Sequence, residues 1–183
     1  MNREEALTLV RQRIKNKNLV KHILAVEAVM RALANRFGED PERWGLAGLL
    51  HDIDYEETAE DPQRHSKVGA DFIHSLGVEE EIVDAVRSHN EAHGIPRETL
   101  MQKALYSADP LTGLIVACAL VHPEKRLEPL TAEFVMKRFG EKAFARGASR
   151  HVISACADMG LALEEFISIG LDAMKHIHTE LGL

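Results

Sequence analysis

Apolar residues return at every third or fourth position through most of this 183-residue chain. The clearest series is Leu19, Ile23, Val26, Met30 and Leu33. This spacing places all five side chains on one face of an α-helix, because a helix completes a turn every 3.6 residues. No stretch alternates apolar and polar residues over more than a few positions, as a half-buried strand would. The pattern therefore predicts an all-α fold.

Capping signals divide the chain into successive helices. Three Asp-Pro pairs, at 40–41, 61–62 and 109–110, are typical of helix starts, because the aspartate caps free N–H groups and the proline has no N–H to lose. Gly77 and Gly94 stand where helices are expected to end. We expect helices over 3–15, 18–37, 41–51, 62–76, 79–91, 98–108, 110–121, 131–140, 148–159 and 163–181.

A polar segment near residue 122 marks a change along the chain. Residues 122–129 hold two prolines and four charged side chains, a composition that favours a connection over a helix. We expect a helical core at 1–121 and a C-terminal helical extension at 122–183 packed on the same domain. The length is sufficient for one domain with a substantial hydrophobic core.

Charge and cysteine content exclude several classes of protein. With 22 basic and 29 acidic residues the formal net charge is −7, which argues against broad binding to duplex nucleic acid. Cys118 and Cys156 form neither a disulfide framework nor a Cys-x-x-Cys metal pair. The first residues lack the apolar stretch of a signal peptide, and the longest apolar run, 114–121, is too short to cross a bilayer. We expect a cytoplasmic protein without membrane contact.

Histidine is over-represented, with ten residues in the chain. Six histidines and aspartates on five expected helices face the core side: His22, His51, Asp52, His65, His89 and Asp109. A buried imidazole needs only a hydrogen-bond partner, whereas a buried unpaired carboxylate costs several kcal/mol. A bound metal ion removes that cost, because it neutralises the carboxylate and coordinates the ring nitrogen. The whole set indicates a metal site.

Each of these residues alone has a simpler interpretation. A single histidine on an apolar face is usually a core residue with one hydrogen-bond partner. Asp109 would cap a helix, as Asp40 and Asp61 are expected to do, and Asp52 would cap a loop. These alternatives account for single residues but not for the set. Five other histidines are expected at the surface: His74, His122, His151, His176 and His178.

The strings around these residues resemble a known family. They are GLLHDID at 48–54, HSKVGA at 65–70, SHN at 88–90 and YSAD at 106–109, with His22 upstream. This order is similar to that of HDIG-type members of the HD-domain superfamily of metal-dependent phosphohydrolases. The resemblance covers about half of the chain, and it implies a single HD-domain helical bundle with the C-terminal extension added to it.

The resemblance also implies one or two divalent metal ions, with two favoured. The first ion would be held by His22, His51, Asp52 and Asp109. Asp52 would bridge to a second ion, held by His65 and His89. His93, one turn beyond His89, is a candidate additional ligand. Mixed imidazole and carboxylate ligands suit Mn²⁺, Fe²⁺, Zn²⁺, Co²⁺ or Mg²⁺, although so many imidazoles argue against a site with Mg²⁺ alone.

The chain departs from the family pattern directly after Asp52. The glycine of HDIG is Asp54 here, and the lysine that often follows it is Tyr55, so no lysine role carries over. Asp54, Glu56 and Glu57 add carboxylates close to the site. One of them could accept a hydrogen bond from a metal-bound water, but we expect a solvated acidic loop.

For activity, the resemblance implies hydrolysis of a phosphate ester or anhydride by a metal-bridging hydroxide that Asp52 positions. Two metal ions lower the pKa of the bound water that gives this hydroxide, and they neutralise charge on the phosphoryl oxygen. We expect a small phosphorylated substrate that resembles a nucleotide. Arg64, Lys67, Arg87 and Lys103 are candidates for contacts with its phosphate, although basic side chains on helices are usually solvated.

Two other classes of protein use a similar ligand set. With two irons, the set resembles that of HD-type oxygenases, which cleave C–H bonds with O₂. A non-catalytic ligand-binding module would keep the fold without turnover, although such a module is expected to lose ligands. Activity under anaerobic conditions separates hydrolysis from oxygenation, and turnover of a phosphate ester separates an enzyme from a binding module.

Overall fold

The computed structural model describes residues 1–183, and all of its regular elements are helices, so the all-α prediction is confirmed. The elements are α1 (Arg3–Arg13), α2 (Lys17–Phe37), α3 (Pro41–Leu50), α4 (Tyr55–Thr58), α5 (Lys67–Ser75), α6 (Glu80–Ser88), the 3₁₀-helix η1 (Glu91–His93), α7 (Leu100–Val121), α8 (Ala132–Phe139), α9 (Arg150–Ser154), the 3₁₀-helix η2 (Ala155–Met159), α10 (Leu163–His176) and α11 (His178–Leu181).

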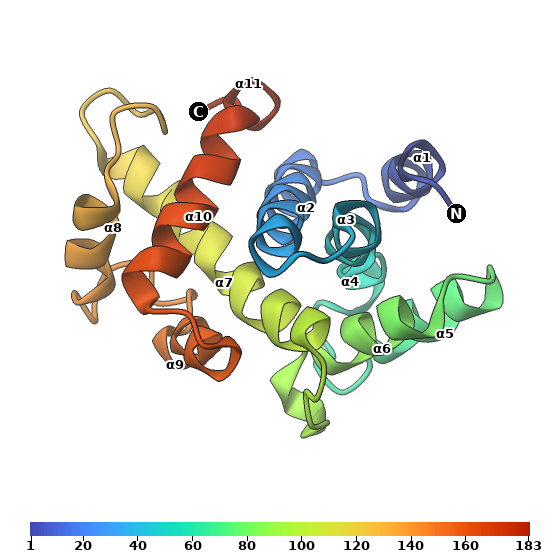
Figure 1. Cartoon of the computed structure of the whole chain (residues 1–183). Helices are drawn as coiled ribbons and strands as arrows, with labels where there is room; N and C mark the ends of the chain where they lie inside the picture. The colour runs from blue at the N-terminus through green and yellow to red at the C-terminus, as the bar shows by residue number, and fades with distance from the viewer.

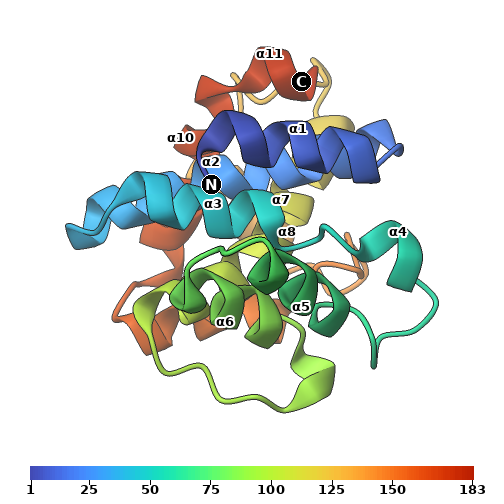
Figure 2. The ribbon, with the colours of Figure 1, turned by 90° about the vertical axis from the view of Figure 1, so that its right-hand side faces the viewer.

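Two long helices, α2 and α7, organise the molecule. Figure 1 shows α7 running diagonally through the middle, with α8, α9 and α10 toward one side and α1 to α6 toward the other. Helix α2 packs against α3, α7 and α10. In the view turned by 90°, α1 and α3 lie above the pair formed by α5 and α6 (Figure 2). The metal-site candidates therefore come from elements that meet around α2, α3 and α7.

One hydrophobic core of 44 buried residues holds the chain together. It contains Ile23 of α2 and Leu105 of α7, and also Val135 of α8 and Phe166 of α10. Helix α7 ends at Val121, and the C-terminal helices pack on it through this shared core. The division into 1–121 and 122–183 stays a prediction.

Helix α7 corrects the prediction of two helices at 98–108 and 110–121. It is continuous from Leu100 to Val121, with Pro110 in its interior. An internal proline costs about 3 kcal/mol or more, because it removes one backbone hydrogen bond and crowds the preceding turn. The buried apolar residues on both sides of Pro110, among them Leu105 and Leu111, offset that cost by packing into the core. Asp109 therefore lies within a helix and is not an N-cap.

Because α7 is continuous, it is longer than the apolar run 114–121 on which the expectation of no membrane-spanning helix was based. By length and composition alone α7 could span a bilayer, because its most apolar window has a mean hydropathy of 1.6. The expectation based on the run 114–121 did not foresee a helix of this length. However, 61% of that window is buried against other helices of the fold. Helix α7 packs here as the central core helix.

The segment 61–66 corrects a second helix boundary. Asp40 caps α3 as expected, with its carboxylate accepting from Glu42 N at 2.8 Å. By contrast, the helix expected to begin after Asp61 begins only at Lys67. Ser66 has a left-handed backbone with φ of 69°, which no helix can contain. His65 therefore lies on a turn before α5 and not on its apolar face.

Candidate metal centre

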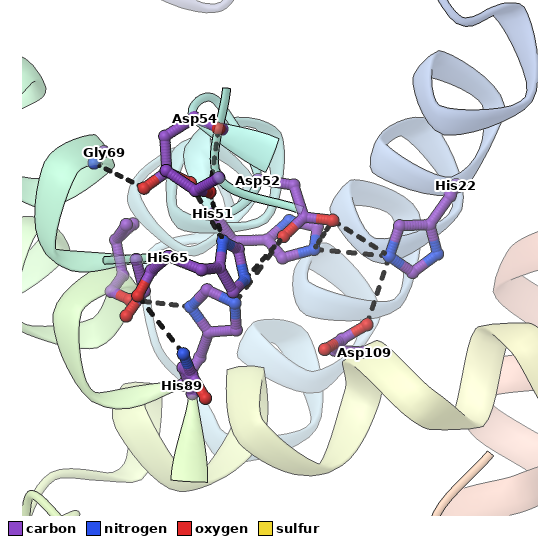
Figure 3. Close-up of polar contacts among 12 residues, drawn as sticks. His22, His51, Asp52, Asp54, His65, Gly69, His89 and Asp109 are labelled. Atoms are coloured by element: carbon purple, nitrogen blue, oxygen red, sulfur yellow. Dashed lines mark hydrogen bonds and ion pairs between the residues drawn. The ribbon is translucent and has the colours of Figure 1, made fainter. Parts of the chain in front are cut away.

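The six predicted ligands come together in one cluster (Figure 3). They arrive from different elements: His22 on α2, His51 and Asp52 directly after α3, His65 on the turn before α5, His89 directly after α6, and Asp109 inside α7. His51 and His89 occupy the C-cap positions of their helices. Helix interiors, helix ends and one turn thus direct side chains to the same place, whereas the sequence predicted His65 and His89 on helix faces.

Asp52 lies at the centre, and its two oxygens face two different histidine pairs. Oδ2 lies 3.4 Å from His51 Nε2 and 3.7 Å from His22 Nε2. Oδ1 lies 3.4 Å from His65 Nε2 and 3.6 Å from His89 Nε2. The two resulting groups, each with the atom spacing of a metal site, share Asp52 as their common member. A carboxylate in this position can bridge two cations.

Asp109 belongs to the first of these groups by position. Its Oδ1 lies 3.1 Å from His22 Nε2, and that nitrogen lies 3.3 Å from His51 Nε2. Two imidazoles and two carboxylates thus converge on one side of Asp52. Such a mixed nitrogen and oxygen set suits a borderline divalent ion.

Backbone carbonyls determine the tautomer of two of the histidines. The Nδ1–H of His51 donates to Gly48 O at 2.8 Å, and the Nδ1–H of His89 donates to Val86 O at 2.6 Å. In both cases the carbonyl belongs to the last turn of the preceding helix. Because Nδ1 carries the proton, Nε2 keeps a free lone pair that is directed at Asp52.

Side chains hold the other two histidines in the same tautomer. Thr112 Oγ1 donates to Asp109 O at 2.9 Å, so its lone pairs accept from His22 Nδ1–H at 3.1 Å. His65 Nδ1–H donates to Asp54 Oδ1 at 3.0 Å. All four imidazoles therefore present Nε2 to the cluster. This outer layer of hydrogen bonds is the arrangement by which proteins orient metal-binding histidines.

The burial and charge of the cluster fit a divalent cation. His89 Nε2 is buried and has no hydrogen-bond partner, which is costly unless another group occupies that position. Burial opposes ionisation of Asp52, but the neighbouring imidazoles of His89 and His22 hold the pKa of Asp52 well below its usual range. Burial lowers the pKa of His51, which keeps that ring neutral, the form that binds metal.

The turn that carries His65 is held by residues of α6 and η1. Ser66 Oγ donates to Arg87 O at 3.0 Å, which stabilises the left-handed backbone at Ser66. Asn90 Nδ2 donates to His65 O at 3.2 Å, and His93 Nε2 donates to the same oxygen at 2.7 Å. His93, the candidate additional ligand, thus contacts the backbone of His65 and lies in neither ligand group.

Asp54 is the site residue whose role the sequence did not predict. Instead of belonging to a solvated loop, its side chain is 1% exposed. Its Oδ1 holds His65, and its Oδ2 accepts from Gly69 N at 2.8 Å (Figure 3). The one feature of the sequence that could have indicated this role is the replacement of the HDIG glycine by Asp54. Glu56 and Glu57 are exposed, as expected.

Four basic residues were candidates for phosphate contacts: Arg64, Lys67, Arg87 and Lys103. Arg64 is exposed and paired with Glu57 at 2.8 Å, and Arg87 is paired with Asp71 at 2.9 Å. Lys67 is exposed and Lys103 is partly buried. None of the four lines a cavity beside the cluster. The structure therefore does not bring them to the site.

Two cavities open beside the cluster at Asp109. The first, of about 220 Å³, is lined by His65, His89 and Asp109 and by polar residues of η1 and α7. The second, of about 380 Å³, is lined by His22 and Asp109. Gly147 contributes to the wall of both cavities. The C-terminal extension therefore borders the site.

Comparison with known proteins agrees with this geometry. The family model for the HD domain matches residues 19–120, which include all six cluster residues. The chain belongs to the HD-domain family. The recognition made from its motifs is therefore confirmed, and with it membership of a superfamily of metal-dependent phosphohydrolases. No solved structure gives a significant match.

Two kinds of curated relative are similar to this HD-domain protein. Ribonuclease Y of Lawsonia intracellularis is 33% identical over 141 residues, which cover 74% of this chain and 26% of the relative. The symmetrical bis(5'-nucleosyl)-tetraphosphatase of Bacillus subtilis is 32% identical over 130 residues, which cover 60% of this chain and 68% of the relative. The chain thus spans about a quarter of the Ribonuclease Y relative and about two thirds of the tetraphosphatase.

Proposed function

We propose that this HD-domain protein is a metal-dependent phosphohydrolase that cleaves a phosphate ester or anhydride of a small nucleotide-like molecule. The observation that carries the proposal is the position of Asp52, whose two oxygens face separate pairs of Nε2 atoms. A carboxylate shared between two ligand groups can bridge two metal ions, and a pair of ions close together is the arrangement used in two-metal hydrolysis.

In this proposal the chain holds two divalent ions. His22, His51 and Asp109 would hold the first ion together with Asp52, and His65 and His89 would complete the second. When bound, such ions supply a nucleophile from water near neutral pH and neutralise charge on the phosphoryl group.

The chain itself supplies orientation and a place for the substrate. The hydrogen bonds at the four Nδ1 atoms orient the rings before any ion arrives, so little rearrangement is needed on binding. The cavities of about 220 Å³ and 380 Å³ are close to the size of small-molecule sites, which enclose about 300–1,000 Å³. These volumes support a compact substrate. The similarity to a tetraphosphatase that acts on bis-nucleosyl compounds supports a nucleotide.

The test combines metal analysis with a substrate screen. Purified protein is analysed for metal content and then loaded with Mn²⁺, Fe²⁺ or Co²⁺. It is assayed on mononucleotides, dinucleoside polyphosphates, generic phosphate esters and short single-stranded RNA, in air and under anaerobic conditions. Release of phosphate or nucleotide from one of the small compounds, persisting without O₂, supports the proposal. Failure to hydrolyse any small phosphate compound, or activity that requires O₂, contradicts it.

A further inference from the structure

The cavity of about 220 Å³ beside Asp109, here called the leaving-group cavity, has an unusual charge for a phosphate-binding protein. Asn90, Glu91, Tyr106 and Ser149 provide its polar lining beyond the cluster residues. No lysine or arginine lines it, and none lines the neighbouring cavity of about 380 Å³. Outside the metal cluster, the only charge at its wall is therefore the negative charge of Glu91.

The Glu91 side chain is held in place by an ordered set of contacts. Tyr106 O–H donates to Glu91 Oε2 at 2.9 Å. Behind the tyrosine, the Arg97 guanidinium stacks on the ring at 3.7 Å and donates to Ser88 O at 2.9 Å. Arg97 thus supports the tyrosine from outside the cavity. Burial and the Glu91 hydrogen bond raise the pKa of Tyr106, so its hydroxyl keeps its proton.

Two arginines of the segment 138–150, which leads into the C-terminal wall of the cavity, are engaged within that segment. Arg150 donates to Phe144 O at 2.7 Å and to Ala148 O at 2.8 Å, so its guanidinium ties the wall loop together. Arg138 pairs with Glu141 at 2.8 Å. These contacts engage the two guanidinium groups in the structure of the loop and not in recognition of an anion.

We propose that the leaving-group cavity binds an uncharged group rich in hydroxyls or amines, so that the substrate is a phosphate monoester of a nucleoside or sugar. This inference rests on the proposed function and narrows it. The Glu91 carboxylate accepts hydrogen bonds from hydroxyl and amino groups. The Nδ2 group of Asn90 already donates to Pro62 O and His65 O, so Asn90 offers its amide oxygen as a further acceptor. Further phosphates would need cationic partners, and here they would instead meet Glu91.

Hydrolysis of such a monoester needs water as its only co-reactant. The oxygen of water joins the phosphorus, and the ester P–O bond breaks. One proton from the water ends on the oxygen of the leaving alcohol. The products are inorganic phosphate, which would leave from the metal side, and the free nucleoside or sugar, which would leave through the cavity.

A comparison of substrates tests the inference. The metal-loaded protein is assayed on nucleoside monophosphates, sugar monophosphates, nucleoside diphosphates and a dinucleoside tetraphosphate. We expect kcat/KM to be about tenfold or more higher for the best monoester than for any polyphosphate, because like charges face each other in the polyphosphate complex. Equal or faster cleavage of the polyphosphates overturns the inference while leaving the proposed hydrolase function intact.

A binding measurement separates the two proposals when no hydrolysis occurs. Nucleosides and sugars without phosphate are titrated into the full-length Asp52→Ala variant and followed by ligand-observed NMR, with Glu91→Gln introduced as a second change. Binding that weakens with Glu91→Gln supports the cavity even if no phosphate ester is cleaved. Absence of binding by all of them, or binding that Glu91→Gln leaves unchanged, overturns it.

Glu91→Gln in the active protein gives a sharper test, because Glu91 is exposed and its replacement preserves the shape of the side chain. We expect the preference for monoesters over diphosphates to fall by about tenfold, mainly through KM. The matched control is Glu60→Gln, an exposed glutamate outside the cavity. An unchanged preference in Glu91→Gln, or an equal change in the control, contradicts the inference.

Discussion

Asp54 Oδ1 lies 3.0 Å from His65 Nδ1, in a position where the family motif has glycine. The other three cluster histidines donate to neutral oxygens, two carbonyls and one hydroxyl. At Nδ1, His65 alone is held by a carboxylate. It lies on a turn before α5, whereas His51 and His89 directly follow the last turns of α3 and α6. We infer that the charge of Asp54 compensates for the weaker local support of His65.

Asp54→Asn should therefore weaken the second metal position selectively. An asparagine here is uncharged and has only one acceptor oxygen, so it cannot accept from both His65 Nδ1 and Gly69 N. Mutation of an outer hydrogen-bond partner typically lowers metal affinity by about 10–100-fold. Metal stoichiometry measured by elemental analysis after dialysis against increasing chelator should show one ion lost early and one retained. Thr112→Val is the matched control, since Thr112 holds His22 and should affect the other ion. Equal loss of both ions in Asp54→Asn would show a general effect on folding instead.

The cluster was predictable because ligands on helices follow helical spacing. His22, His51 and His89 are placed by regular helices whose apolar faces are evident from the sequence. The HD motif then orders the remaining ligands. What the spacing predicts is that the residues converge; which nitrogen faces which oxygen depends on carbonyls and side chains elsewhere in the fold.

The three Asp-Pro pairs show where local sequence is insufficient. Asp40 caps a helix, Asp61 lies in a turn, and Asp109 lies within α7. The dipeptide is the same in all three cases, so the difference comes from packing. Helix α7 continues through Pro110 because both of its halves are buried, whereas the chain after Asp61 forms only hydrogen-bonded turns until α5 begins at Lys67.

Substitutions of the ligands themselves should distinguish the two metal positions. Asp52→Ala should remove both metal ions and all hydrolysis, because Asp52 is the member that both groups share. His89→Ala should chiefly remove the second ion, because His89 faces only Oδ1 of Asp52. Elemental analysis together with a phosphate-release assay checks both. Full metal content in Asp52→Ala would contradict the assignment of the site.

Removal of metal should lower the thermal stability of the protein. A ligand that binds only the native state stabilises it by about 2.7 kcal/mol at a concentration of 100 times its Kd. For a domain of this size, each kcal/mol shifts Tm by about 2–4 °C. Scanning calorimetry before and after treatment with EDTA, with metal added back, measures the shift. Asp52→Ala should show no response to metal, and an identical response in that variant would indicate binding elsewhere.

Cys118 should be unreactive in the folded protein. Its side chain is fully buried on α7, and burial raises the pKa of the Cys118 thiol to about 11. Because the thiolate is the reactive form, only about one thiol in a thousand is reactive at pH 8. Titration with a thiol reagent should show slow modification at pH 8 in native protein and rapid modification in denaturant. Rapid modification of Cys118 in native protein would mean that α7 opens locally.

The contact between Gly48 and Glu27 links the fold to the first metal position. A Cβ added at Gly48 would lie 2.8 Å from the Cα of Glu27, a backbone atom that cannot move without shifting α2. Gly48→Ala should therefore separate α3 from α2, and with them His51 from His22. Such overpacking costs about 1–3 kcal/mol.

Denaturant unfolding and metal affinity should fall together in Gly48→Ala, with the ion held by His22 and His51 affected first. Gly113→Ala is the matched control, because Gly113 lies in α7 with open space around its Cα. There the added methyl should leave stability unchanged or raise it by up to about 1 kcal/mol, since alanine favours a helix over glycine. If Gly48→Ala kept both its stability and its metal affinity, close contact between α2 and α3 would not be what brings His22 and His51 together.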